Sequence, residues 1–409
     1  MSKKKKLSLA AQIFIGLFLG IIAGFIFLAA GKAEWAVAYV KPFGTIFLNL
    51  IKFIVVPIVL CSIIGGVISM KDIRKVGSIG WKTVVYYLFT TAFAVIIGLI
   101  FANLFKGTFQ VLQTSDLEYE VAQTTNFMDT LVNIFPSNII QPLANASMLQ
   151  VIVIALFFGF GIILAGEKGE PLAKVIVSLS DVSMIIMELI LKLSPIGVFC
   201  LITPVVAENG AKILGSLAMV LLTAYISYVV HAVVVYSASV KTMAGLSPVK
   251  FFKGMAPAMA MAFSSASSVG TLPLNLECAE KLGAKRDIAS FVLPLGATIN
   301  MDGTAIYQGV CAVFIATCFG IDLTLTEMMT IVLTATLASI GTAGVPGSGM
   351  IMLAMVLQSV GLPVEGIALV AGVDRIFDMG RTVVNITGDS ACAVVVSSLE
   401  DRKQEKKKK

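Results

Sequence analysis

Charged residues are scarce in this chain. Asp, Glu, Lys and Arg make up 13% of its 409 residues, whereas a soluble domain carries about 25%. Hydrophobic residues make up 57%, and the mean hydropathy is +0.95. This composition excludes an ordinary soluble protein. It predicts an all-α polytopic protein, because helices satisfy their own backbone hydrogen bonds inside lipid.

Histidine is rarer still, and the cysteines are unpaired in sequence. The chain has one histidine, His231, and none of its six cysteines belongs to a CxxC pair, so we interpret all seven as packed core residues. The sequence lacks HExxH, GxxxxGK[ST], a strand-borne GxGxxG and a GxSxG elbow with a partner histidine. We therefore expect no enzyme. A carboxylate protease built on Asp302 and Asp378 is the formal alternative, and a channel is another, although no repeated pore filter is present.

The net charge of +6 does not indicate a nucleic-acid partner. Basic residues lie beside apolar segments, as in KDIRKVGSIGWK (71–82) and the tail DRKQEKKKK (401–409). Such positions are typical of the positive-inside rule, with membrane lipid headgroups as the alternative partner. The rule predicts a multi-pass protein of the cell (plasma) membrane with both termini in the cytoplasm.

Apolar segments of about 20 residues, the length that crosses a bilayer, predict about eight transmembrane helices. They lie near residues 7–31, 42–69, 80–106, a broken stretch 128–166, 173–206, 213–242, 287–318 and 365–398.

Two further apolar segments are interrupted in the middle. Serines, Gly270 and Pro273 interrupt residues 251–283, and a cluster of Gly and Pro interrupts residues 331–362. Each half is too short to cross, so we expect two re-entrant helical hairpins, each followed by a long helix, as inverted repeats. Interrupted segments in corresponding positions of two halves are the sequence pattern of a transporter binding site.

The last span carries most of the polar chemistry. At about 100° per residue its polar residues fall within an arc of roughly 100° on one helix face. They are Asp374, Asp378, Arg381, Thr382, Asn385 and Asp389. Charge inside a membrane helix must face protein, ions or water. Carboxylates suit hard cations and a guanidinium suits a carboxylate, so this face predicts a site for an anionic substrate beside cations.

The span at 287–318 contains GATINMDGTAIYQGV. The Asp302–Gly303 pair is a turn signal, which inside a membrane predicts an unwound stretch. Backbone carbonyls freed there, together with Asp302, suit a dehydrated Na⁺. A kink satisfied by neighbouring helices is the alternative, but it leaves the buried aspartate unexplained.

Four motifs in order resemble the glutamate transporter family, the dicarboxylate/amino acid:cation symporters. They are SSASSVGTLP (264–273), NMDGT (300–304), GTAGVPGSG (341–349) and DMGRTVVNITGD (378–389). The resemblance implies a homotrimer that works by an elevator-like movement. It implies scaffold helices 1–2 in residues 1–77 and 4–5 in 128–207. Helix 3 (78–107) and residues 208–400, with helices 6–8 and both hairpins, would form the transport domain.

The resemblance also implies site residues. Arg381 would bind the substrate side-chain carboxylate and Asp378 its amino group. The remaining substrate contacts would be Thr382, Asn385, Ser267, Ser268, Thr304, Val345 and Gly349. Na⁺, the coupling ion, would take three sites: Asp389 with Gly296, Asn300 and Asn385; Thr298, Ser339, Ile340 and Thr342; and Tyr87, Thr90, Thr91, Asn300 and Asp302.

Four positions refine this interpretation. Some members carry an arginine in the first hairpin or directly after the substrate-binding aspartate, where this chain has Ala266 and Met379. Our hypothesis is that Arg375 supplies that charge; a cation facing water or headgroups is the alternative. Gln308 stands where proton- and potassium-coupled animal members have a glutamate, which predicts Na⁺ coupling without K⁺ counter-transport.

Arg381 and Asp378 together favour L-aspartate or L-glutamate as the substrate. The alternatives are a proton-coupled carrier of the same fold, or a carrier of neutral amino acids, cystine or dicarboxylates.

Overall fold

The computed structural model describes residues 9–69, 78–111, 132, 135–145, 147–340 and 348–408, and within these residues every regular element is a helix. The all-α expectation is confirmed. The first half contains α1 (Leu9–Ala29), α2 (Ala33–Trp35), η1 (Ala36–Val40), α3 (Lys41–Ser69), α5 (Ser78–Phe105), η3 (Lys106–Thr108), α7 (Ile140–Ala144), α8 (Met148–Ala165), η4 (Gly166–Gly169), α9 (Glu170–Leu191) and α10 (Ser194–Asn209).

The second half contains the two interrupted segments and the helices that follow them. Its elements are α11 (Lys212–His231), η5 (Ala232–Tyr236), α12 (Ser237–Met243), α13 (Pro248–Ser265), α14 (Ser268–Lys281), α15 (Arg286–Ile299), α16 (Asp302–Cys318), α17 (Leu325–Ala338), α18 (Ser348–Ser359), η6 (Val364–Gly366), α19 (Ile367–Ala371) and α20 (Asp374–Lys408). The hairpin-then-helix unit therefore occurs twice, as α13–α14 before α15–α16 and as α17–α18 before α20.

Six helical stretches in the described part of the chain are long and apolar enough to cross a membrane, and shorter apolar helices accompany them. The polytopic expectation is thus confirmed, with two corrections. The single crossing expected at 173–206 is wrong, because α9 ends at Leu191 and α10 begins at Ser194. Pro195 in the first turn of α10 lacks an N–H and favours a new helix start there. The helix expected from 365 begins only at Asp374.

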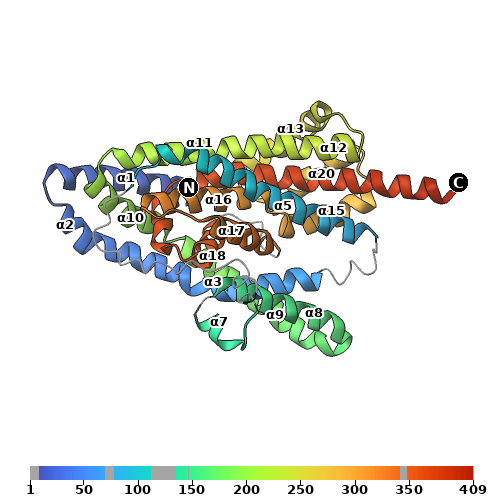
Figure 1. Cartoon of the computed structure of the whole chain (residues 1–409), viewed down its shortest axis with the longest axis horizontal. Helices are drawn as coiled ribbons and strands as arrows, with labels where there is room; N and C mark the ends of the chain where they lie inside the picture. The colour runs from blue at the N-terminus through green and yellow to red at the C-terminus, as the bar shows by residue number, and fades with distance from the viewer. Residues whose placement is uncertain are drawn as a thin grey trace, which may run out of the picture.

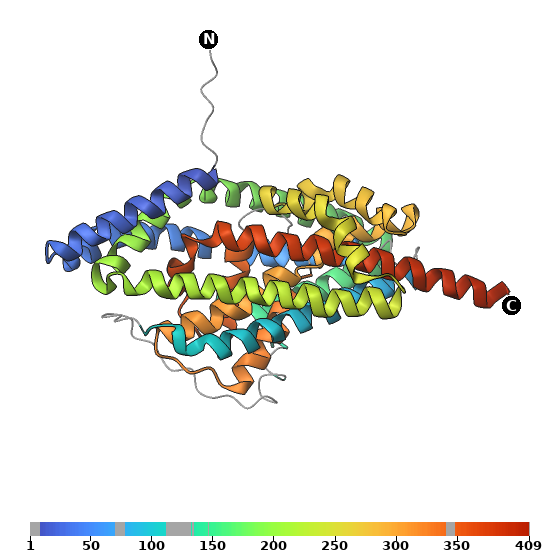
Figure 2. The ribbon, with the colours of Figure 1, turned by 90° about the horizontal axis from the view of Figure 1, so that it is seen from above.

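The helices pack in two groups. In the first, α1 packs on α10, and α3 packs on α8, α9 and α10. In the second, α16 packs on α5 and α20, while α13, α14 and α15 also contact α20. Figures 1 and 2 show the long helices running roughly along the long axis of the molecule, with α20 leaving the body at its C-terminal end. Hairpin α17–α18 reaches the first group through α3 and α8.

Three glycines let α1 lie directly against α10. Gly16, Gly20 and Gly24 are spaced four residues apart, so they share one face of the helix. A Cβ atom at any of them would overlap atoms of α10, including the carbonyl oxygen of Pro195 and the side chain of Ile202. Small residues at this spacing allow close helix approach in membranes, where van der Waals packing rather than the hydrophobic effect drives helix association.

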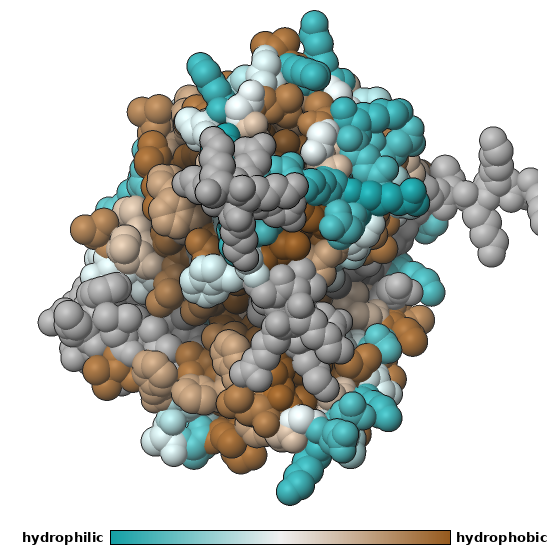
Figure 3. Space-filling view, turned by 90° about the vertical axis from the view of Figure 1, so that its right-hand side faces the viewer, coloured by the Kyte–Doolittle hydropathy of each residue, from teal (hydrophilic) through white to brown (hydrophobic). Residues whose placement is uncertain are grey.

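The outside of the body is apolar. Phe18 on α1, Phe53 on α3, Phe89 on α5 and Leu104 on α5 are each at least 65% exposed. Seen from the end at which α20 leaves the body, hydrophobic residues cover much of the described face, and hydrophilic ones gather mainly at the upper right and the lower edge (Figure 3). Apolar side chains exposed on this scale fit contact with lipid.

Replacing Gly20 with isoleucine should push α1 away from α10. Overpacking of a well-packed contact costs about 1–3 kcal/mol, so we expect a lower unfolding temperature of the purified protein in detergent. Gly215→Ile is the matched control, because Gly215 is exposed on α11 and a Cβ there meets no atom within 4 Å. Equal unfolding temperatures for the two variants would contradict a close α1–α10 contact.

Candidate functional site

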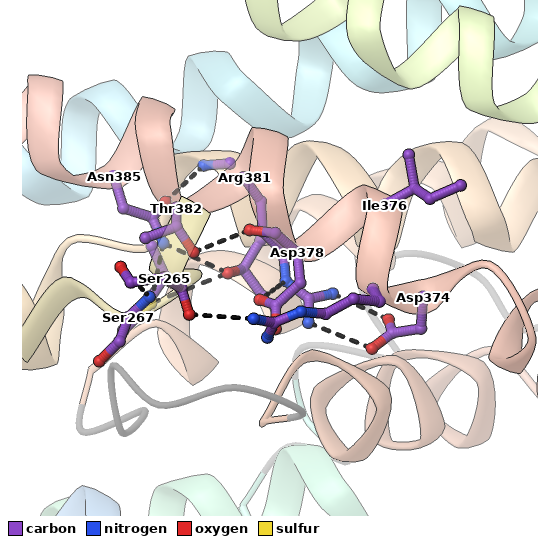
Figure 4. Close-up of polar contacts among 12 residues, drawn as sticks. Ser265, Ser267, Asp374, Ile376, Asp378, Arg381, Thr382 and Asn385 are labelled. Carbon is purple, nitrogen blue, oxygen red and sulfur yellow. Dashed lines mark hydrogen bonds and ion pairs between the residues drawn. The ribbon is translucent and has the colours of Figure 1, made fainter. Parts of the chain in front are cut away.

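The polar face of the last span folds as a continuous part of α20, and all six of its polar residues are buried. Figure 4 shows Asp374, Asp378, Arg381, Thr382 and Asn385 beside the serines at the tip of hairpin 1, which is α13 and α14 with residues 266–267 between them. The structure therefore brings the first hairpin and the charged helix together, as the sequence predicted.

Arg381 is held between two aspartates. Its side chain is 2% exposed, its Nε donates to Asp378 Oδ1 at 2.8 Å, and its Nη1 and Nη2 donate to the two oxygens of Asp374 at 3.0 and 3.4 Å. A buried guanidinium is costly unless its donors are paired. The two carboxylates meet that requirement and fix the plane of the guanidinium.

Packing confines the same guanidinium from two other sides. Its central carbon lies 4.8 Å from the ring centroid of Tyr307 on α16, a cation–π geometry. Gly349, in the first turn of α18, lies so close that a Cβ there would overlap the Arg381 guanidinium. Gly303 lies equally close to the Arg381 backbone. Each glycine therefore permits an approach that a side chain would block.

Two helices begin beside this charged group. Ser267 precedes α14 and its hydroxyl accepts a hydrogen bond from the Gly270 N–H at 3.0 Å, an N-cap. The Gly349 contact places the start of α18 at Arg381. Helix N-termini present N–H groups and a positive dipole end, which favours an anion. Ser268, in the first turn of α14, is buried.

Asn385 links α20 to the start of α16. Its Oδ1 accepts from the Gly303 N–H at 2.7 Å, and its Nδ2 lies 3.3 Å from Met301 Sδ and 3.5 Å from the Thr304 hydroxyl. The Thr382 hydroxyl donates to the Asp378 carbonyl at 2.8 Å. Thr304, Thr382 and Asn385, all predicted substrate contacts, thus line one side of the Arg381 region.

The predicted unwound stretch is present. Helix α15 ends at Ile299 and α16 begins at Asp302, and Asn300 between them has an extended backbone. Asn300 is fully buried; its Nδ2 donates to Asp389 Oδ1 at 2.8 Å and to the Asn385 carbonyl at 3.0 Å. Its Oδ1 finds no hydrogen-bond partner in the described residues. An orphaned buried oxygen beside a carboxylate fits a cation ligand.

Gly296 completes this corner. A Cβ there would overlap Asp389 Oδ1 and lie against the Tyr87 hydroxyl. Gly296, Asn300, Asn385 and Asp389 are therefore neighbours, as predicted for one cation site. Asp389 is 1% exposed and contacts no Lys or Arg side chain among the described residues.

Asp302 is the centre of a second buried network. Thr91 donates to its Oδ1 at 2.6 Å, Tyr236 donates to its Oδ2 at 2.8 Å, and His231 Nε2 lies 3.2 Å from Oδ2. In an α-helix, residues five apart differ by about 140° in direction. The π-helical turn η5, between His231 and Tyr236, lets both side chains reach the same carboxylate.

Most of the remaining predicted cation ligands hydrogen-bond to backbone carbonyls. The Tyr87 hydroxyl donates to the Val292 carbonyl at 3.1 Å. The hydroxyls of Thr90, Thr298 and Ser339 donate to carbonyls three residues earlier in the chain, and Ile340 lies in the turn after α17. Thr342 and Val345 fall in residues 341–347, outside the described residues.

Sequence reasoning missed three members of the site. Asp374 was placed on the polar face but not as the partner of Arg381, and Tyr307 and Tyr236 were not singled out. His231 is a buried core histidine as interpreted, but its contact with Asp302 was not expected. Periodicity could not reveal the His231–Tyr236 pairing, because it depends on the π-helical turn.

The match to known proteins covers nearly the whole chain. The model of the sodium:dicarboxylate symporter family matches residues 9–399. The chain belongs to the sodium:dicarboxylate symporter family. Members of this family are transporters, not enzymes, which agrees with the absence of catalytic motifs.

Several bacterial members of the sodium:dicarboxylate symporter family are similar over their full length. The proton/sodium-glutamate symport protein of Geobacillus stearothermophilus is 38% identical, covering 99% of this chain and 97% of that protein. The proton/glutamate-aspartate symporter of Escherichia coli is 36% identical, covering 99% and 96%. The C4-dicarboxylate transport protein of Bacillus subtilis is 30% identical, covering 98% and 95%.

Replacing Arg381 with leucine should destabilise the folded protein strongly. It leaves Asp374 and Asp378 buried without their common partner, and breaking a buried ion pair costs about 3–5 kcal/mol. Adding Asp374→Asn should restore part of the lost unfolding temperature, because the uncompensated charge is removed. The measurement is thermal unfolding of the purified single and double variants.

The matched control is Arg286→Ala, since the Arg286 side chain is 87% exposed and lies 3.8 Å from Glu280. We expect little change from it, because exposed ion pairs contribute little. If Arg381→Leu behaved like this control, the ion-pair account of the site would be wrong.

Proposed function

We propose that this protein is a secondary active symporter that takes up an acidic amino acid, L-aspartate or L-glutamate, coupled to Na⁺. The observation that carries the proposal is the buried Arg381 guanidinium beside the tip of hairpin 1 and the start of α18. It is the one guanidinium in the described residues that is both almost fully buried and flanked by the starts of two helices.

The residues around Arg381 favour an amino acid that carries two carboxylates. A substrate side-chain carboxylate would replace Asp374 at Nη1 and Nη2 of Arg381 to form a bidentate contact, and the start of α14 or α18 suits the second carboxylate. Asp378, 5% exposed and hydrogen-bonded to Arg381, suits the substrate ammonium. A substrate without an amino group would leave Asp378 without that partner, which disfavours a plain dicarboxylate.

Charge balance favours co-transported cations. Among the described residues, the buried core holds four carboxylates, Asp302, Asp374, Asp378 and Asp389, but one guanidinium group, Arg381, with Arg375 at its edge. An unpaired buried charge is strongly unfavourable. Na⁺ prefers oxygen ligands of the kind found at Asn300, Asp302 and Asp389, and its arrival beside these residues would compensate the excess negative charge.

Binding of substrate and cations at the same helices couples them physically. Asn385 faces the substrate region through Thr304 and the cation region through its carbonyl, which accepts from Asn300. A change in how α16 and α20 pack at Asn385 would therefore affect both the substrate site and the cation site. A substrate that adds negative charge raises the affinity for cations nearby, and linkage makes the effect mutual.

The assembly we propose is a homotrimer in the cell membrane, with both termini in the cytoplasm and an elevator movement. The static scaffold would comprise residues 1–77 and 128–207, and the transport domain residues 78–107 and 208–400. The division is supported by packing: α1, α3, α8, α9 and α10 contact one another, while α5 packs mainly on α11, α16 and α17.

The alternatives keep the same fold and site. Relatives are named for proton-coupled and for C4-dicarboxylate transport, so a proton-coupled carrier or a dicarboxylate carrier is the second candidate. His231 beside Asp302 is the observation that favours the proton-coupled candidate. Neutral amino acids and cystine are further alternative substrates.

Uptake of radiolabelled L-aspartate into proteoliposomes tests the proposal. We expect uptake that requires an inward Na⁺ gradient, is blocked by unlabelled aspartate or glutamate, and is unaffected by internal K⁺, because the neutral Gln308 cannot carry a proton. The control is an imposed pH gradient without Na⁺. Uptake under that pH gradient alone would mean that the coupling ion is H⁺ and not Na⁺. Competition by succinate equal to that by aspartate would favour the dicarboxylate alternative.

Replacing Arg381 with cysteine or threonine should change substrate preference. Loss of the guanidinium removes the partner of the second carboxylate, so we expect aspartate uptake to fall by at least tenfold, with serine or alanine becoming better competitors. Competition assays on the same liposomes measure the change. Undiminished aspartate uptake by either variant would reject the role assigned to Arg381.

A further inference from the structure

The tip of hairpin 1 has a strained backbone. Helix α13 ends at Ser265, and Ala266 then adopts a left-handed conformation with φ of 51°. It is the one non-glycine residue with positive φ among the described residues. Such conformations cost free energy and persist only where neighbouring groups hold them. The structure therefore needs a contact that keeps this tip in place.

Arg375 makes that contact from α20. Its Nη2 donates to the Ser265 carbonyl oxygen at 3.1 Å, while its Nη1 lies 3.6 Å from Asp378 Oδ2. The last carbonyls of a helix lack intrahelical donors and carry partial negative charge. A guanidinium with several N–H groups in a fixed plane can serve the helix end and the carboxylate together, which a lysine cannot.

Asp378 is consequently held from both sides. Its Oδ1 accepts from Arg381, and its Oδ2 faces Arg375. The Arg375 side chain is 20% exposed, so it lies at the edge of the buried site rather than in its centre. Figure 4 shows Ser265 and Ser267 beside the segment of α20 that carries Asp378.

We propose that Arg375 is a positioning residue that fastens the tip of hairpin 1 to α20 and fixes the orientation of the Asp378 carboxylate. The predicted effect of Arg375 on substrate binding rests on the proposed function. Its predicted effect on the hairpin tip does not. Arg375 acts on the substrate through Asp378 and the start of α14. Hairpin 1 and the charged part of α20 then move as one unit.

Hydrogen–deuterium exchange of the full-length, substrate-free protein tests the fastening. In Arg375→Ala we expect the amides of residues 265–271 to exchange about tenfold faster, because the tip loses its attachment. Peptides from α16 should be unchanged. Arg286→Ala, which removes an exposed guanidinium at the start of α15, is the matched control and should leave both regions unchanged.

Arg375→Lys separates positioning from charge alone. The ammonium keeps a positive charge near Asp378 but cannot hold both partners, so we expect fast exchange at the tip and aspartate affinity about ten- to hundredfold weaker, as in Arg375→Ala. If amide exchange in Arg375→Ala rose throughout the protein, that variant would be generally destabilised, and the Arg375→Lys variant alone would test the proposal.

Wild-type exchange at residues 265–271 in the folded variants would overturn the proposal. Full rescue of aspartate affinity by lysine would overturn it as well, because charge alone would then suffice. Exchange is measured without substrate, so a protein that did not transport aspartate would still show whether Arg375 holds the hairpin tip. A failure of the Arg375 proposal can therefore be told apart from a failure of the proposed function.

Discussion

The burial of Arg381 between Asp374 and Asp378 is the constraint on which the rest of the site depends. A guanidinium removed from water needs partners on every side, and the structure supplies two carboxylates, the face of Tyr307 and the glycine-lined start of α18. The starts of α14 and α18, beside it, offer backbone N–H groups. A pair of continuous helices would present side chains there instead of backbone N–H groups.

The break between α15 and α16 does the opposite: it gathers buried oxygen atoms rather than a buried positive charge. Asn300 leaves helical geometry, donates to Asp389 and Asn385, and keeps one buried oxygen without a partner among the described residues. Asp302, directly after the break, is held by Thr91 and Tyr236. The buried guanidinium of Arg381 thus lies on one side of Asn385, and the buried carboxylates of Asp302 and Asp389 lie on the other.

Much of this arrangement was predictable from the sequence, for physical reasons. Interrupted apolar segments predicted both hairpins, the Asp302–Gly303 pair predicted the break, and the period of α20 gathered its polar residues on one face. What depends on tertiary contact was not predictable. Asp374 pairs with Arg381 across two helical turns, and His231 meets Tyr236 only through a π-helical turn. The division at Leu191 was also missed, because an apolar run gives little sign of where one helix stops.

The contact between Gly349 and Arg381 restricts how this protein can change over evolutionary time. A side chain at position 349 has no room while the guanidinium is present. While Asp374 and Asp378 hold the guanidinium in place, position 349 is therefore limited to glycine, and a smaller residue at position 381 would give room for a side chain there. The order in which positions 381 and 349 can change is therefore set by van der Waals volume.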